Sequence, residues 1–220
     1  MKVLAIDTAT ERCSVALRID GVVIERSVET ARGHADLVLP MVQEVLAEAA
    51  VALTALDGIA YGRGPGAFTG VRIAIGVVQG LAFGAGLRTV GVSNLAAVAQ
   101  QVAAASARIL VCMDARMNEV YWGEFGCDPE TALVTAAGAE AVGPPDSVHS
   151  SPLPTILAGN GFRAYPQLAA RFDNLSAHDL LPHAAPIALL GEARLRAGEG
   201  LAAWEAQPVY LRNNVAVAKK

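Results

Sequence analysis

The stretch GRGPGAFTGVRIAIGVVQGLAFGAG, residues 62–86, decides how the rest of the chain is interpreted. Its first part is rich in glycine, as in a loop that cradles a phosphate, and its second part is apolar, as in a buried helix. A Walker A loop needs a lysine after its glycines, and none follows here. The pattern therefore favours a structural turn that leads into a closely packed helix over a nucleotide-binding loop.

Glycines recur at positions 76, 80 and 84, which would lie on one face of that helix. Each costs a helix interior up to about 1 kcal/mol relative to alanine, so an offsetting gain is expected. The usual gain is the close approach of a second backbone. We therefore expect a strand or helix, from this chain or from a partner, to lie against these glycines. The apolar run 73–87 is shorter than the roughly 20 residues of a membrane span, which favours a buried helix.

The composition indicates a folded protein with a sizeable core. The chain has 220 residues, of which 53% are hydrophobic and 17% charged, and its net charge is −4. This balance argues against disorder and supplies no global field that would attract nucleic acid. Three cysteines without CxxC spacing predict neither a disulfide framework nor a zinc site. Since Asp7 interrupts the first apolar run too early for a signal peptide, we expect a cytoplasmic protein without a membrane span.

A weak internal repeat predicts two similar halves. A buried strand leads into a turn at Asp7, and a second such strand leads into a turn at Asp114. In the segment after the first of these turns, Asp20 and Gly21 predict a tight hairpin turn that joins two further strands. We expect two α/β domains, residues 1–104 and 105–220, with the last segment, 207–220, packing back on the first.

A predicted helix near residues 37–49 has an apolar stripe broader than one core face needs. Leu39 and Leu46 extend the stripe sideways, and Gln43 and Glu44 border it. Surplus apolar surface with a polar rim is typical of an interface. The alternative is a helix that is buried broadly inside one chain. Further along, Ser93 is expected to cap the helix that follows the glycine-rich region.

Two halves that each open with a strand, an Asp turn and a hairpin resemble the actin, hexokinase and Hsp70 superfamily. The segments IDTAT (6–10), GPGAFTGVRIA (64–74) and PVYLR (208–212) are similar to those of the TsaB (YeaZ) family, over essentially the whole chain. That family works with TsaD in making threonylcarbamoyladenosine on tRNA. The resemblance implies an α/β fold of two actin-like (RNase H-like) halves, each a mixed sheet flanked by helices.

Active members of the superfamily hold phosphates and a metal with two Asp-led loops, one in each half. The resemblance places Asp7, Thr8 and Thr10 in the first Asp loop (residues 7–10) and Asp114 in the second (residues 114–116). Ala9 stands where such a loop usually carries glycine, and the second loop has no glycine, serine or threonine. Both loops look degraded, so we expect turn-capping aspartates and no cofactor, and weak nucleotide binding is left open.

The resemblance also argues against a metal site. TsaD carries a V-x-H-x-E-x-H motif, whose histidines would fall on Asn94 and Val98 here and whose glutamate would fall on Ala96. Valine cannot bind a metal and asparagine is a weak ligand for a transition metal. We therefore expect no metal and no catalysis. The alternative is an active enzyme of the superfamily, either a small-molecule kinase or ATPase or a metallopeptidase.

The resemblance implies a subunit that binds and supports TsaD through the helices of its first half and recruits TsaE. It would form a homodimer without TsaD and would meet tRNA mainly through the complex. The residues expected to bind the partner lie on the two first-half helices: Leu39, Val42, Leu46, Phe68, Arg72, Gly76 and Gly80.

Overall fold

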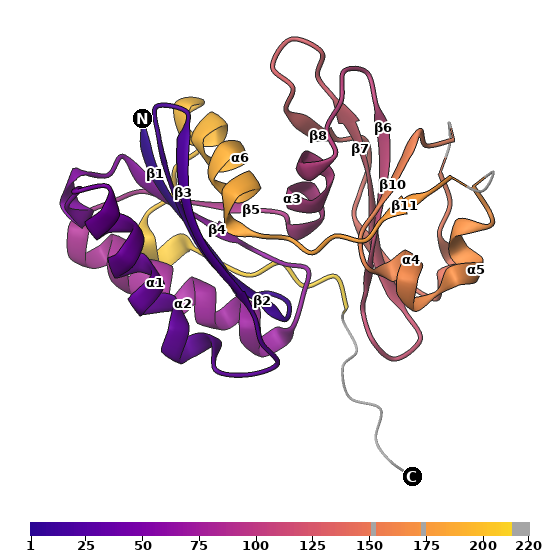
Figure 1. Cartoon of the computed structure of the whole chain (residues 1–220), viewed down its shortest axis with the longest axis horizontal. Helices are drawn as coiled ribbons and strands as arrows, with labels where there is room; N and C mark the ends of the chain where they lie inside the picture. The colour runs from indigo at the N-terminus through magenta and orange to yellow at the C-terminus, as the bar shows by residue number, and fades with distance from the viewer. Residues whose placement is uncertain (151–152, 173–174, 213–220) are drawn as a thin grey trace.

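Two β-sheets organise the chain into two lobes that lie side by side (Figure 1). The structure is a computed structural model and describes residues 1–150, 153–172 and 175–212. The strands that precede Asp7 and Asp114 are the central strands of the two sheets, since each has a neighbour on both sides.

The first sheet has the strand order β3-β2-β1-β4-β5, in which β1, β2 and β3 are antiparallel neighbours and β4 and β5 run parallel to β1. Helices α1 and α2 cover its outer face (Figure 1). The elements of this lobe are β1 (Lys2–Asp7), β2 (Arg12–Ile19), β3 (Val22–Glu29), α1 (His34–Glu48), η1 (Leu53–Ala55), β4 (Gly58–Gly62), α2 (Phe68–Ala85) and β5 (Thr89–Val92).

The predicted hairpin is confirmed. Asp20 and Gly21 join β2 to β3, and their φ angles of 47° and 92° are both positive, as a type I′ turn requires. Ser93 is also confirmed as the cap of the next helix, because its hydroxyl oxygen accepts the backbone N–H groups of Leu95 and Ala96 at 3.1 and 3.3 Å.

The second sheet has the order β11-β10-β6-β7-β8, with β9 also paired to β7. Short helices and loops cover the face of this sheet that points away from the first lobe (Figure 1). The elements of this lobe are β6 (Arg108–Asp114), β7 (Val120–Cys127), β8 (Val134–Ala136), β9 (Ala141–Gly143), η2 (Pro145–Ser147), β10 (Ile156–Ala158), α4 (Gly161–Ala164), α5 (Pro166–Ala169) and β11 (Ala177–His178).

The two sheets repeat one topology. With β9 set aside, β6, β7, β8, β10 and β11 stand in the same order and with the same directions as β1, β2, β3, β4 and β5. The predicted fold class, an α/β fold of two actin-like halves with a mixed sheet in each, is confirmed.

Two helices exchange between the lobes. Helix α3 (Asn94–Gln101) follows β5 but packs on β6, β7 and β8, whereas α6 (Ala184–Arg196) follows the second sheet but packs on β1, β2 and β4. Both lie between the sheets in Figure 1. One apolar core, with members as far apart in sequence as Val3, Ile109 and Ile187, therefore extends from one sheet to the other. The chain then passes through η3 (Ala203–Glu205) to its last described residues.

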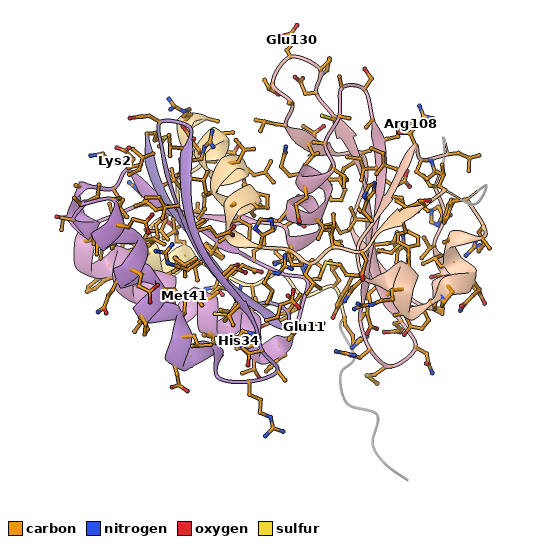
Figure 2. All side chains as sticks on the ribbon, in the orientation of Figure 1. Lys2, Glu11, His34, Met41, Arg108 and Glu130 are labelled. Carbon is orange, nitrogen blue, oxygen red and sulfur yellow. The ribbon has the colours of Figure 1, made fainter. Side chains whose placement is uncertain are left out.

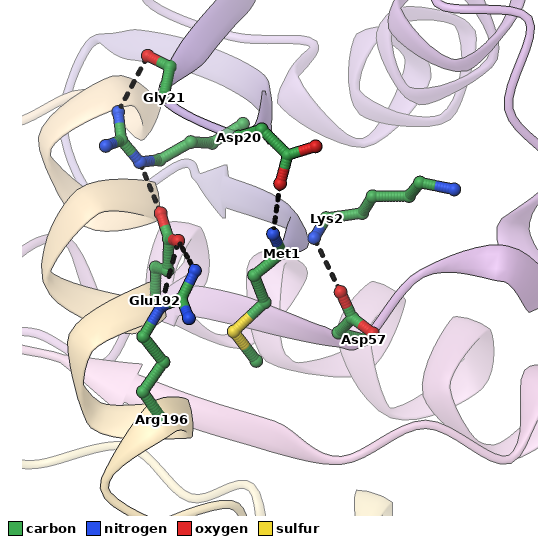
Figure 3. A network of polar contacts seen from close by, with 8 residues as sticks. Met1, Lys2, Asp20, Gly21, Asp57, Glu192 and Arg196 are labelled. Atoms are coloured by element: carbon green, nitrogen blue, oxygen red, sulfur yellow. Dashed lines mark hydrogen bonds and ion pairs between the residues drawn. The ribbon is translucent and has the colours of Figure 1, made fainter.

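A mostly buried ion pair attaches α6 to the first sheet (Figure 3). Nε of Arg18 on β2 donates to Glu192 on α6 at 2.5 Å, and Arg196 donates to the same carboxylate at 2.7 Å. Removing Glu192 would leave the mostly buried Arg18 guanidinium without a carboxylate partner, so the pair opposes loss of α6 from the sheet.

The domain division at residues 104 and 105 stays a prediction, because α3 and α6 each follow one lobe in sequence and pack on the other.

The start of α2 lies against the first Asp loop through two glycines. A Cβ atom at Gly70 would be 2.0 Å from the carbonyl oxygen of Thr8, and one at Gly66 would be 2.5 Å from that of Ala9. Only glycine permits this approach of two backbones. The sequence favoured a structural turn over a phosphate-binding loop at this point. In the structure, this turn and the start of α2 pack directly against the first Asp loop.

The glycines in the middle of α2 face open space. A Cβ atom at Gly76, Gly80 or Gly84 would have nothing within 4 Å. The described part of the chain therefore does not supply the close approach that we expected, and approach by a partner stays a prediction. The helix is buried on one face only, so the expectation of a buried helix was wrong for its outer side.

Helix α2 is the one helix among the described residues that is long and apolar enough to cross a membrane. That is weak support for a membrane span, because the core helix of a soluble protein meets the same criteria. Its buried face packs against the first sheet, which accounts for its apolar composition without a bilayer.

Replacing Gly70 by alanine is expected to destabilise the chain by about 1–3 kcal/mol, the usual range for overpacking, because the new methyl group would collide with the Thr8 backbone. Gly80→Ala is expected to stabilise the chain by up to about 1 kcal/mol, because alanine favours a helix and the space is free. Urea denaturation followed by circular dichroism measures both effects. Equal effects at the two positions would contradict the contact between α2 and the first Asp loop.

Candidate functional site

A cleft of about 850 Å³ lies between the lobes. The first Asp loop, the start of α2 and the second Asp loop line it, together with residues 209–212 near the end of the chain. Glu11 and His34, at the lower edge of the first lobe in Figure 2, are among its lining residues. The fold therefore brings the two Asp loops, more than a hundred residues apart in sequence, to one cleft.

The polar groups of the first Asp loop are already bonded within the chain. The Thr8 hydroxyl donates to the carbonyl oxygen of Gly70 at 2.7 Å, and the Ala67 N–H donates to the carbonyl oxygen of Ala9 at 2.7 Å. The carbonyl oxygen of Thr10 lies 2.9 Å from Nε2 of His34. The Thr8 hydroxyl, which is the donor among these groups that could meet a phosphate, is thus already bonded within the chain.

Asp7 is fully buried and does not line the cleft. Its Oδ1 accepts a hydrogen bond from Nδ2 of Asn94 at 2.7 Å, and Asn94 in turn accepts the N–H of Gly64 at 2.8 Å. Its Oδ2 has no hydrogen-bond partner among the described residues. Burial raises the pKa of Asp7 to about 6, against the opposing effect of the bond from Asn94.

Asp114 does reach the cleft, and it caps its own turn as predicted. Its Oδ1 accepts the backbone N–H of Arg116 at 2.8 Å, and its Oδ2 lies 3.2 Å from the Arg116 guanidinium. Its backbone N–H donates to Oδ1 of Asn160 at 2.9 Å. The carboxylate is thus paired within its own loop.

The C-terminal segment, residues 206–212, connects the lobes beside the cleft. It hydrogen-bonds along the first lobe, where the Val209 N–H donates to the carbonyl oxygen of Arg63 at 2.8 Å. It then crosses to the second lobe, where Arg212 donates to Glu119 at 2.5 Å and to the carbonyl oxygen of Ala115 at 2.9 Å. The sequence marked this segment only by its family resemblance, because nothing local in it indicates a contact with either lobe. Residues 213–220 of the predicted terminal segment lie outside the described residues.

The outer surface of α1 and α2 carries most of the residues expected to bind a partner. Leu39, Phe68 and Phe83 are 45%, 57% and 76% exposed, which is unusual for large apolar side chains. We call this surface the partner face and define it by its exposed members: Leu39, Phe68, Arg72, Gly76, Gly80 and Phe83. Phe83 was not among the predicted residues, although it lies seven residues after Gly76 and three after Gly80 and therefore shares their helical face.

Val42 and Leu46 are placed differently from Leu39. Val42 is only 3% exposed and packs in the core of the first lobe, and Leu46 is half-buried beside it. Val42 therefore offers little surface to a partner in the folded chain.

Asn94 and Val98 stand at the positions that correspond to the TsaD histidines, and both make contacts within the folded chain. Asn94 bonds to Asp7 and Gly64, and Val98 lies in the core between the lobes. Within residues 1–150, 153–172 and 175–212, no group of three or more histidine, cysteine, aspartate or glutamate residues is placed to hold a metal ion.

Sequence comparison adds the family. The tRNA threonylcarbamoyladenosine biosynthesis protein TsaB of Escherichia coli (strain K12) is 43% identical over 228 residues, which cover 100% of this chain and 98% of the relative. The chain belongs to the TsaB family. The TsaB of Haemophilus influenzae is 35% identical over 240 residues, covering 98% of this chain and 95% of the relative.

Structural and family comparisons agree. YeaZ from Pseudomonas aeruginosa superposes with a TM-score of 0.83 at 42% identity over 96% of this chain and 99% of that chain. A second structure, described as an uncharacterized protein with similarity to peptidase YeaZ from the same organism, gives a TM-score of 0.85 at 43% identity over the same shares. The family model described as TsaD: tRNA N6-adenosine threonylcarbamoyltransferase matches residues 10–219. This chain is thus similar both to TsaB proteins and to the family described by the TsaD model.

Asp7→Asn is expected to flatten the pH dependence of stability. The raised pKa means that the folded chain holds the proton more tightly than the unfolded chain, so this stabilisation is present below pH 3.8 and is lost as the pH rises through about 6. The loss, of the order of 2–3 kcal/mol, should disappear in the variant, whose amide oxygen still accepts from Asn94.

Urea denaturation at several pH values across that range measures this difference, with Asp146→Asn as an exposed control. If the Asp7→Asn variant loses as much stability with rising pH as the parent chain, the buried carboxyl group is not the cause.

Proposed function

We propose that this chain is a non-catalytic subunit of the machinery that makes tRNA N6-threonylcarbamoyladenosine. It binds and supports TsaD through the partner face, recruits the ATPase TsaE, and meets tRNA mainly through the complex, in the cytoplasm. In the absence of TsaD the same face pairs two copies of the chain. The names of the TsaB relatives support the pathway, and the open glycine face carries the proposal of a partner.

The partner face has the features of an unfilled helix-packing surface. Gly76 and Gly80 weaken the helix and contact nothing in the described chain, so their benefit must come from outside it. Small residues at a four-residue spacing let a second helix approach closely. Leu39, Phe68 and Phe83 add exposed apolar area around these two glycines.

TsaD suits this face because it shares the family of this chain. A family model for TsaD that matches residues 10–219 implies that TsaD has counterparts of α1 and α2. Two such helices from each chain would form a four-helix contact, a common way to bury amphipathic faces. A second copy of this chain offers the same helices, which accounts for pairing with itself when TsaD is absent.

The non-catalytic role is supported by the state of the first Asp loop. The Thr8 hydroxyl and the Ala9 carbonyl oxygen are bonded to the start of α2, and Asp7 is buried behind them. A kinase or ATPase of the superfamily would need these groups free to meet a phosphate or its metal. Releasing them would require breaking the packing of Gly66 and Gly70, which also positions α2.

Leu39→Glu is expected to weaken TsaD binding at least tenfold, because burying an apolar side chain at a contact contributes about 1.5–3 kcal/mol and a carboxylate there adds a desolvation cost. Isothermal titration calorimetry against TsaD measures the change. Glu130→Lys, at the far tip of the second lobe in Figure 2, is the control. A folded Leu39→Glu variant that binds like the parent would place the TsaD contact elsewhere. Val42→Glu is unsuitable as a probe, because Val42 lies in the core.

Gly80→Leu is expected to separate folding from binding. The isolated variant should be at least as stable as the parent, because leucine favours a helix by up to about 1 kcal/mol over glycine and nothing lies within 4 Å. Its affinity for TsaD should fall by more than about tenfold, because the larger side chain holds the second helix away. Thermal unfolding and calorimetry test the two parts, with Gly138→Leu in the second lobe as a matched open site. Unchanged affinity for TsaD would rule out close helix packing at this glycine.

A further inference from the structure

Arg72 lies in an aromatic cluster at one end of the partner face. Its guanidinium carbon is 3.3 Å from the centre of the Phe68 ring and 5.0 Å from that of Tyr210. The two rings stack with their centres 5.8 Å apart. Phe68 belongs to α2 and Tyr210 to the C-terminal segment, so two distant parts of the chain hold one guanidinium by cation–π contacts.

The guanidinium N–H groups of Arg72 have no hydrogen bond or ion pair with any described residue. Three other arginines of the first lobe pair with carboxylates, Arg12 with Glu29, Arg18 with Glu192, and Arg26 with Glu44 and Glu48, whereas Arg32, Arg63 and Arg88 resemble Arg72 in having no ion pair among the described residues. Arg72 is also exposed, so its donors face outward from the partner face.

Neither composition nor helix electrostatics accounts for a cation at this position. Arg72 is the only charged residue in α2, whose other exposed positions are apolar, glycine or polar without charge. It is the fifth residue of α2 and therefore not in the last turn, where the helix dipole favours an arginine. An exposed positive charge in an otherwise uncharged helix, oriented by two rings, indicates a negatively charged group that comes from outside the chain.

We propose that Arg72 is the receptor for a carboxylate side chain of TsaD and sets the orientation of TsaD on the partner face. This inference rests on the proposed function. The planar guanidinium presents paired N–H groups that match the two oxygens of a carboxylate, and the rings reduce the entropy that the arginine loses on binding. Of the three acids of α1, Glu44 and Glu48 are already bonded to Arg26, and Asp36 makes no ion pair with Arg72.

A protein carboxylate fits this site better than an RNA phosphate. Binding along RNA depends on several cations that replace counterions, and α2 offers one. The chain has a net charge of −4, and the surface beyond Arg72 consists of Gly76, Gly80 and Phe83 rather than of further cations. An apolar surface with one oriented charge is typical of a protein interface.

The test compares TsaD binding by the full chain and by Arg72→Gln, Arg72→Lys and Arg72→Glu, using calorimetry at low and high salt. Arg72→Gln removes the charge but keeps a polar side chain with N–H donors, and it is expected to weaken binding at least about thirtyfold, as for a desolvated charge pair that loses one partner. Arg72→Lys should recover part of this loss and Arg72→Glu none. The salt dependence of affinity should shrink in Arg72→Gln. Arg163→Gln, in the second lobe, is the control for loss of an arginine charge.

The outcomes separate this inference from the function on which it rests. If the parent chain does not bind TsaD, both fail. If the parent binds TsaD and both Arg72→Gln and Arg72→Glu bind it as tightly as the parent, the assignment of Arg72 as a carboxylate receptor is wrong while the partner role stands. Two further results would also overturn the inference: weaker retention of tRNA with unchanged TsaD affinity, which would assign Arg72 to a phosphate, or weaker self-association alone, which would assign it to a second copy.

Discussion

The backbone contact between the start of α2 and the first Asp loop is the constraint on which the rest of the structure depends. Gly66 and Gly70 bring two chain segments to distances that any side chain would prevent. The contact fixes the direction in which α2 leaves the sheet. At the same contact, the Thr8 hydroxyl and the Ala9 carbonyl oxygen are hydrogen-bonded to the start of α2. The contact therefore holds the first Asp loop in place and leaves the opposite side of α2 facing solvent.

The lobes are held together by more than the two helices that exchange between them. Arg212 of the C-terminal segment, which also hydrogen-bonds along the first lobe, pairs with Glu119 of the second lobe. The Ser93 hydroxyl at the start of α3 bonds to the Glu140 carboxylate across the lobes. Any change in the angle between the lobes would have to break several of these contacts, which limits the use of the cleft as a hinge.

A chain with this architecture can use either its cleft or its outer surface. At the cleft, Asp114 is paired with Arg116, whereas Asp7 is buried behind the cleft and bonded to Asn94, so both loop aspartates are held by the chain itself. On the outer surface, Gly76 and Gly80 contact nothing and Arg72 has no carboxylate partner among the described residues. The open glycines and the unpaired Arg72 therefore lie on the partner face, which is the physical basis for the proposed supporting role.

The sequence by itself determined the features that depend on neighbouring residues. Asp20 and Gly21 specify a turn because both positions need a positive φ, and the repeated strand and Asp turn predicted two similar sheets. Only the tertiary structure decided which glycines are packed and which are open. Gly70 and Gly80 look alike in the sequence, but Gly70 meets a carbonyl oxygen 62 residues away, and no local pattern encodes that distance. Packing between elements that are remote in sequence also decided that Leu39 is exposed and Val42 buried on one apolar stripe. The same kind of packing set the path of the C-terminal segment across both lobes.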